Sequence, residues 1–397
     1  MKTFRRILNL GASSLVLVLS FSAPAFSQTS PEDCNSIYQN LVARRGSTEI
    51  AVAEQALASG KEYQTKCKGL AATEGFDKID QFINLEVPRL QEKVDIMKLE
   101  QAFDAAVKKR SRDDVVSTAK QLIEKNRRYN LDLMLDIASV GFDNASAAPA
   151  DDKYNADAIR YATLVLEKLE KGEDSGTKDK RFGFYFPYKN EKCADGKINA
   201  AGWMNYTIGF ITSTRQKETR AALPYLYKSS QAGCETKAFS ESYRLIGSWY
   251  VDESNKISAQ RAALIKAASD TETPETVALL ELQMGYLDRA IDAYARAYRQ
   301  AATNLKTVPA YKTSLQGVLK ELFAARYEGD ISAMDAYVAK VMDTPFIDPA
   351  TPVAPVKATP VKPVETAPAK AAPGKPGKKT SVPRVKKAVK KPLKKTA

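Results

Sequence analysis

The chain has 397 residues, a formal net charge of +13 and no histidine. The lack of histidine excludes Ser-His-Asp and Cys-His catalysis, zinc hydrolysis at histidine ligands and haem on an axial histidine. A carboxylate-based mechanism is not excluded. The paired carboxylates of a glycosidase are brought together by the fold, so they have no characteristic spacing in the sequence. The charge is unevenly distributed: residues 28–349 hold 44 basic and 46 acidic residues, so the positive charge lies at the two ends.

The first 27 residues have the pattern of a secretory signal peptide. Three basic residues precede an apolar stretch from Ile7 to Phe21, and the small residues Ala25 and Ser27 fit a cleavage site. The alternative is a membrane anchor, but the apolar stretch is shorter than the roughly 20 residues that span a bilayer. We therefore expect an exported protein in the periplasm or cell envelope, without a transmembrane segment in its mature form.

Four cysteines follow the leader: Cys34, Cys67, Cys193 and Cys234. An even number in an oxidising compartment predicts two disulfides, for which three connectivities exist. We favour the sequential pairs Cys34–Cys67 and Cys193–Cys234; four reduced, buried thiols are the alternative. No two cysteines lie two to four residues apart, so the spacing fits no zinc site, and we expect neither a metal nor a cofactor.

From about residue 33 to 345 the apolar residues recur with a period close to 3.6, which predicts helices. The clearest stripes are Phe76–Ile79–Ile83, Ile96–Leu99–Phe103–Ala106, Val115–Ala119–Leu122–Ile123 and Leu131–Met134–Leu135–Ala138. Pro88 is expected to kink or break its helix, and Ser111 with Asp114 forms a capping box that predicts a turn near residue 110. The fold class is therefore all-α, built from antiparallel pairs of helices of 10–18 residues, with almost no strand.

Helix pairs that bury their apolar faces only by stacking on neighbours are typical of an α-solenoid. Tyr243, Ile246, Gly247 and Tyr250 match the first helix of the tetratricopeptide motif, and Gly285, Ala290, Tyr294 and Ala297 match the turn glycine and small-large-small ladder of its second helix. Looser matches lie near Gly209 and Gly329. Over roughly residues 100–345 the chain thus resembles the tetratricopeptide-repeat family, although no repeat matches throughout. The resemblance implies a scaffold and does not specify the partner.

Residues 172–200 interrupt the helical pattern. Five aromatic residues occur within the seven from Phe182 to Tyr188, and the proline and glycine among them disfavour a helix. One interpretation is an aromatic recess for a peptide or glycan, with Phe184, Tyr185, Tyr188, Trp203 and Tyr206 as partner-binding residues. The alternative is a structural plug that folds back and fills its own groove.

Residues 346–397 form a tail rich in Pro, Ala and Lys that has nothing to bury beyond Phe346, so we expect it to be disordered. Its paired lysines resemble the tails of linker-histone-like proteins; they are Lys378, Lys379, Lys386, Lys387, Lys390, Lys391, Lys394 and Lys395. The expected export makes nucleic acid an unfavoured ligand and favours an anionic lipid or polymer of the envelope. A solubilising tail without a partner is the alternative.

Taken by residue number, the predicted organisation is a signal peptide (1–27), an N-terminal helical region (28–95), helical repeats (96–171), the aromatic insertion (172–200), tetratricopeptide-like repeats (201–345) and the basic tail (346–397). The predicted function is a non-enzymatic scaffold or adaptor that binds an unknown protein or peptide in the solenoid groove and is tethered by its tail. The alternatives are a carboxylate-based glycan hydrolase and a secreted nucleic-acid-binding protein.

Overall fold

The computed structural model describes residues 29–70, 75–125, 130–175, 181–184, 186–191 and 193–357. The predicted signal peptide and the paired tail lysines lie outside these residues. The described part is helical, as predicted, apart from one hairpin of two-residue strands. The α-helices are α1 (Pro31–Arg44), α2 (Ile50–Lys66), α3 (Phe76–Lys109), α4 (Arg112–Lys125), α5 (Asn130–Ala145), α6 (Asn155–Glu170), α7 (Gly196–Thr214), α8 (Thr219–Gln231), α9 (Ser240–Ala267), α10 (Pro274–Thr303), α11 (Pro309–Arg326) and α12 (Met334–Lys340). The strands are β1 (Arg181–Phe182) and β2 (Phe186–Pro187), and the short 3₁₀ turns are η1 (Lys68–Leu70), η2 (Glu235–Ala238) and η3 (Val341–Asp343).

Residues up to Lys98 form one compact unit and those from Leu99 onward a second. In the first unit α1, α2 and the first part of α3 enclose a core of aliphatic side chains and Tyr63. Helix α1 begins at a capping box, in which the hydroxyl of Ser30 accepts a hydrogen bond from the amide of Asp33 at 3.1 Å. Gly60 allows α2 to approach α3 closely, since a Cβ there would lie 2.5 Å from the side chain of Val87.

The expected break at Pro88 does not occur. Helix α3 runs without interruption from Phe76 to Lys109 and carries Pro88 in its interior. The side chain of Pro88 is exposed, so its ring meets no neighbouring helix, and the carbonyl that it leaves without a helical partner can be hydrated. The division between the units, after Lys98, therefore falls inside one helix.

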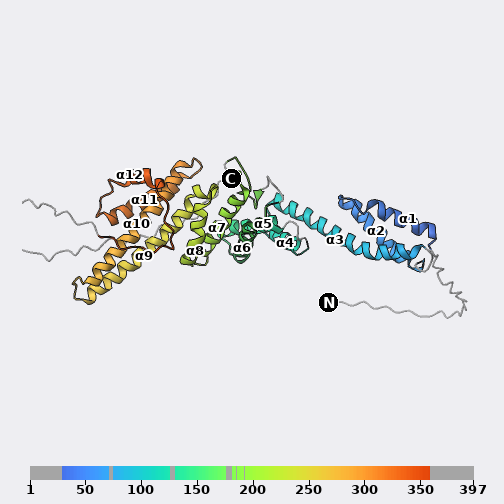
Figure 1. The fold of residues 1–397 in the computed structure, drawn as a ribbon, viewed down its shortest axis with the longest axis horizontal. Helices are drawn as coiled ribbons and strands as arrows, with labels where there is room; N and C mark the ends of the chain where they lie inside the picture. Colours follow the sequence, from blue (N-terminus) through green and yellow to red (C-terminus); the bar gives the residue numbers. More distant parts are fainter. Residues whose placement is uncertain are drawn as a thin grey trace, which may run out of the picture. The chain divides into compact units, whose positions relative to one another are not determined.

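In the second unit each helix from α4 to α10 packs against the next one along the chain, and α11 and α12 pack on α10 (Figure 1). This arrangement is compatible with a solenoid. The hairpin of α9 and α10 is its largest element, with helices of 28 and 30 residues, longer than the 10–18 predicted. Gly247 lies where these two helices cross, as predicted: a Cβ there would lie 2.7 Å from the ring of Tyr294 and 3.3 Å from Ala293.

The four cysteines form the two pairs predicted from the sequence. Cys34 at the start of α1 is joined to Cys67 at the end of α2, with 5.8 Å between the Cα atoms. Cys193, before α7, is joined to Cys234, after α8, with 5.2 Å between the Cα atoms. Each disulfide therefore links the two ends of one helix pair, and both are typical of an exported protein.

Non-reducing peptide mapping of the purified protein should recover these two pairs and no others. The separations of the Cα atoms lie within the range of native disulfides, which supports this expectation. Alkylation of the native protein should label no thiol until a reductant is added. Quantitative labelling of all four thiols before reduction would show that the pairing is wrong.

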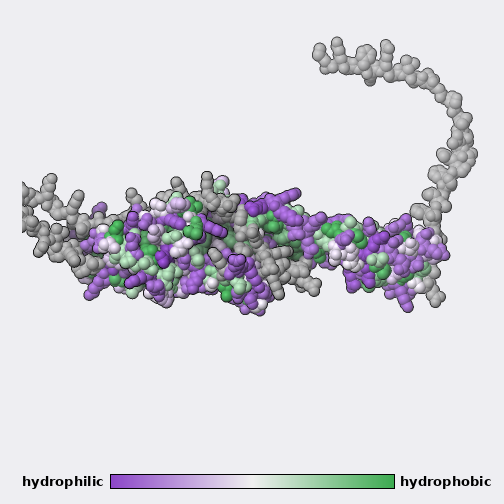
Figure 2. Space-filling view, turned by 90° about the horizontal axis from the view of Figure 1, so that it is seen from above, coloured by the Kyte–Doolittle hydropathy of each residue, from purple (hydrophilic) through white to green (hydrophobic). Residues whose placement is uncertain are grey.

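Hydrophilic residues make up most of the coloured surface in Figure 2, and hydrophobic residues gather there in small separate areas. This distribution agrees with apolar faces that are turned inward between neighbouring helices. None of the helices in the described ranges is both long enough and apolar enough to cross a membrane.

Candidate functional site

The aromatic insertion folds as a tight hairpin on the face of α5. Strands β1 and β2 pair antiparallel, with Phe182 opposite Phe186. Gly183 turns the chain at φ +62°, and a Cβ there would collide with the side chain of Ser139 on α5. The amide of Gly183 donates a hydrogen bond to the carboxylate of Asp136 at 2.5 Å. Asp136 thus holds the tip of the hairpin on α5.

The hairpin adds its aromatic side chains to a cluster on α5 and α7. The ring of Phe186 lies 4.2 Å from that of Trp203 and 6.1 Å from that of Phe142. Tyr206 joins the cluster through edge contacts with Phe142, at 5.5 Å, and with Phe239, at 4.8 Å. These tilted and edge-to-face contacts are the favourable geometry for aromatic rings, so the cluster is a well-packed core.

The structure separates the residues predicted to form one aromatic recess. Trp203 and Tyr206 lie in the cluster, and the side chain of Tyr188 lies under α7 against Gly196. Phe184 lies apart from them, in the wall of a pocket described below, and Tyr185 is outside the described residues. All four described side chains are at least 92% buried. This burial favours the interpretation in which the insertion fills its own groove.

Polar groups around the cluster are bound by groups of the same chain. The carboxylate of Glu235 accepts hydrogen bonds from the amide of Asn190 at 2.6 Å and from the indole of Trp203 at 3.3 Å. The phenol of Tyr188 donates to Asp174 at 2.7 Å; burial, followed by this hydrogen bond, raises the pKa of Tyr188 above its ordinary value. These bonds attach the insertion to the residues before and after it.

The buried phenol of Tyr206 is influenced by the charge of Glu241, on α9. Glu241 is paired with the guanidinium of Arg244 at 2.8 Å and accepts a hydrogen bond from Tyr311 at 2.7 Å. Burial raises the pKa of Tyr206 well above its ordinary value, with a smaller contribution from Glu241. Glu235 and Glu241 are thus both occupied by neighbours, an arrangement typical of a structural network.

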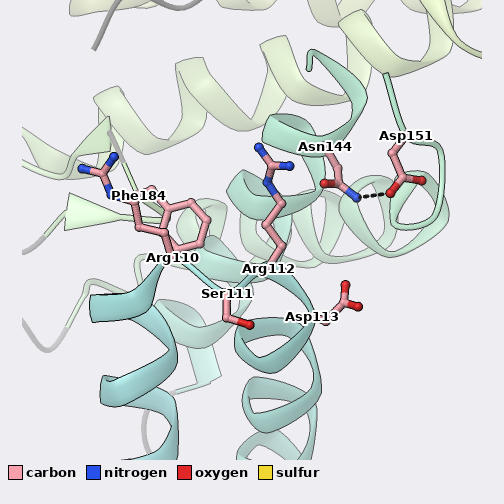
Figure 3. Close-up of a pocket in the computed structure, with 7 residues that line it drawn as sticks. All are labelled: Arg110, Ser111, Arg112, Asp113, Asn144, Asp151 and Phe184. Carbon is pink, nitrogen blue, oxygen red and sulfur yellow. Dashed lines mark hydrogen bonds between the residues drawn. The ribbon is translucent and has the colours of Figure 1, made fainter. Parts of the chain in front are cut away.

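A polar pocket of about 400 Å³ lies where the turn between α3 and α4 meets the end of α5 and the hairpin (Figure 3). Its lining residues are Arg110, Ser111, Arg112, Asp113, Asn144, Asp151 and Phe184. The predicted turn is present: Arg110 has a φ of +55°, and the hydroxyl of Ser111 donates to Asp114 at 2.6 Å. Of the pocket residues, only Phe184 was among the partner-binding residues predicted from the sequence.

The segment that precedes the basic tail is ordered on the body. Residues 346–397 are predicted from the sequence to be a disordered tail, but the segment 346–357 packs on the helices of the second unit. Phe346 is 6% exposed; its ring lies 5.1 Å from that of Tyr243 and 5.3 Å from the guanidinium carbon of Arg296. We call residues 344–357 the anchor segment.

The anchor segment runs along α10, antiparallel to it. The guanidinium of Arg296 donates to the carbonyl of Thr344 at 2.8 Å, near the end of α10. Farther toward the start of the helix, the amide of Val356 donates to the carbonyl of Glu281 at 2.9 Å. Between these points the carbonyl of Ala354 lies against Gly285, where no Cβ could be accommodated.

This contact corrects the role predicted for Gly285. The tetratricopeptide resemblance placed Gly285 at a turn, whereas it lies within α10 and makes room for the anchor segment. The residues of the small-large-small ladder that follows, Ala290, Tyr294 and Ala297, are all buried on α10.

Comparison with protein-family models, with curated proteins and with solved structures gives no match.

Proposed function

We propose that the protein is an exported, non-enzymatic helical-repeat scaffold of the periplasm or cell envelope, tethered by its basic tail to an anionic surface. The second unit would be a tetratricopeptide-like array that binds a protein or peptide partner. The observation that carries this proposal is the anchor segment, since it fixes the start of the tail to α10 through the buried Phe346 and the bonds of Thr344 and Val356.

The distribution of charge supports different roles for the body, which is nearly neutral, and the tail, which is strongly basic. Residues 28–357 hold 45 basic and 46 acidic residues, whereas residues 358–397 hold 12 basic residues and one acidic residue. Each basic side chain near an anionic bilayer contributes about 1 kcal/mol of attraction. The tail thus supplies the positive charge that would bind an anionic surface, and the anchor segment would connect the tail to the folded body.

The full chain from Gln28 onward should bind vesicles that contain anionic lipid at low salt. Binding should weaken as salt rises, because the Debye length falls from about 30 Å at 0.01 M to about 10 Å at 0.1 M. A chain that ends at Lys357 should lose this binding and keep its helical circular dichroism and melting midpoint. Vesicle cosedimentation over a salt series measures the first effect.

The matched control keeps the length of the tail and removes most of its charge, by replacing the eight paired lysines with glutamine, which leaves four basic residues and one acidic residue after Lys357. This variant should behave like the truncated chain. If the chain that ends at Lys357 still binds, then a basic patch on the body carries the attraction and the tether proposal fails. If double-stranded DNA competes away vesicle binding at equal charge concentration, the nucleic-acid alternative is favoured.

A further inference from the structure

The guanidinium of Arg112 has no partner of its own. Arg112 is the first residue of α4 and is half-buried, yet it makes no hydrogen bond or ion pair in the described ranges of the chain. Figure 3 shows its side chain reaching into the space between Phe184 and the hydrogen-bonded pair of Asn144 and Asp151. A guanidinium presents five donors, and those of Arg112 stay accessible to water because the residue is only half-buried. The pocket therefore presents a cation whose donors a ligand could engage without breaking a bond within the described part of the chain.

The acidic residues of the same pocket are bound elsewhere. The carboxylate of Asp113 is paired with the ammonium of Lys153 at 2.8 Å and accepts a hydrogen bond from Tyr154 at 2.5 Å. These two bonds hold the pKa of Asp113 below its ordinary value. The carboxylate of Asp151 accepts from the amide of Asn144 at 3.0 Å and from the backbone of Lys153 at 2.9 Å. Neither acid neutralises Arg112.

A ligand that fits this arrangement brings one negative charge for Arg112. The planar fork of an arginine matches a carboxylate or a phosphate. Asp113 and Asp151 at the pocket wall would repel a doubly charged phosphate more strongly than a carboxylate. Their ionised oxygens keep lone pairs that can accept further hydrogen bonds from a ligand.

We propose that this pocket binds a small molecule in which a carboxylate lies next to hydroxyl or ammonium donors. The carboxylate would pair with Arg112, the donors would face Asp151, and the carbon skeleton would lie against Phe184. The volume of about 400 Å³ suits a ligand of this size. An acidic sugar and a free amino acid share this chemistry, and the proposal does not depend on the tail.

Isothermal titration calorimetry on the chain from Gln28 onward tests the proposal with glucuronate, glycine, acetate and inorganic phosphate as probes. Glucuronate or glycine should bind at millimolar concentration, and acetate and phosphate should bind more weakly. The substitution Arg112→Gln should weaken binding about tenfold or more, since it removes a charge-assisted pair. Arg220→Gln, at an exposed position on α8, is the matched control and should bind like the unaltered chain.

The substitution Asp151→Asn distinguishes a site for a free amino acid from a site for an acidic sugar. It should weaken binding of glycine, whose ammonium needs the negative charge, and leave binding of glucuronate nearly unchanged. Since Arg112 has no partner to lose, Arg112→Gln should keep the melting midpoint, so that a loss of binding is not a loss of fold. The proposal is overturned if neither glucuronate nor glycine binds, if phosphate binds best, or if Arg112→Gln binds as well as the unaltered chain.

Discussion

Replacing Phe346 with alanine should destabilise the second unit by about 3–5 kcal/mol, the usual effect of removing a buried phenylalanine. The ring is 6% exposed and is enclosed by Tyr227, Tyr243 and Arg296. Its loss would leave a cavity among α8, α9 and α10 and would release the start of the tail. Urea denaturation followed by circular dichroism measures the change.

The adjacent residue provides the control for this prediction. Ile347 is 46% exposed, so Ile347→Ala should change the free energy of unfolding by no more than about 0.5 kcal/mol, as most surface substitutions do. Equal effects of the two substitutions would contradict the anchor segment as described. An additional readout is the accessibility of Val356, whose amide should exchange faster with deuterium in Phe346→Ala.

The substitution Gly247→Leu should cost about 1–3 kcal/mol, because it overpacks the crossing of α9 and α10. A Cβ at Gly247 would lie 2.7 Å from the ring of Tyr294, and that ring is 1% exposed and cannot move outward. The melting midpoint of the purified protein should fall accordingly.

Gly317 is a matched control, since it also lies inside a helix and has no atom within 4 Å of the position of its Cβ. Gly317→Leu should leave the midpoint unchanged or raise it slightly, because leucine has a higher helix propensity than glycine. If Gly247→Leu and Gly317→Leu have the same effect, the packing of α9 on α10 differs from that described.

The parts of the fold that the sequence predicted correctly depend on local periodicity and spacing. The helical class, the turn near Ser111 and the position of Gly247 at a helix crossing all follow from residues within one or two turns of each other. The favoured cysteine pairs were also correct, since each closes a single helix pair.

The parts that the sequence did not predict depend on contacts between distant segments. The position of Gly285 in the sequence matches that of the turn glycine in the repeat motif. Only the structure shows the carbonyl of Ala354 against Gly285, which explains why a side chain is excluded there. The anchor segment has the prolines and alanines of a disordered tail, and its order comes from the groove that receives Phe346. The sequence did not single out Arg112, because an arginine at the start of a helix is common. That it has no partner in the described part of the chain is visible only in the structure.

The composition of the anchor segment has a consequence for proteolysis. Residues 341–356 contain no lysine or arginine, whereas 12 basic residues follow Lys357. A protease that cleaves after basic residues would therefore remove the cationic part of the chain and find no cleavage site between Lys340 and Lys357. The product would keep Phe346 and Val356 on α10. If the tail binds a surface as proposed, one cut after Lys357 would release the protein from that surface with the anchor segment still in place.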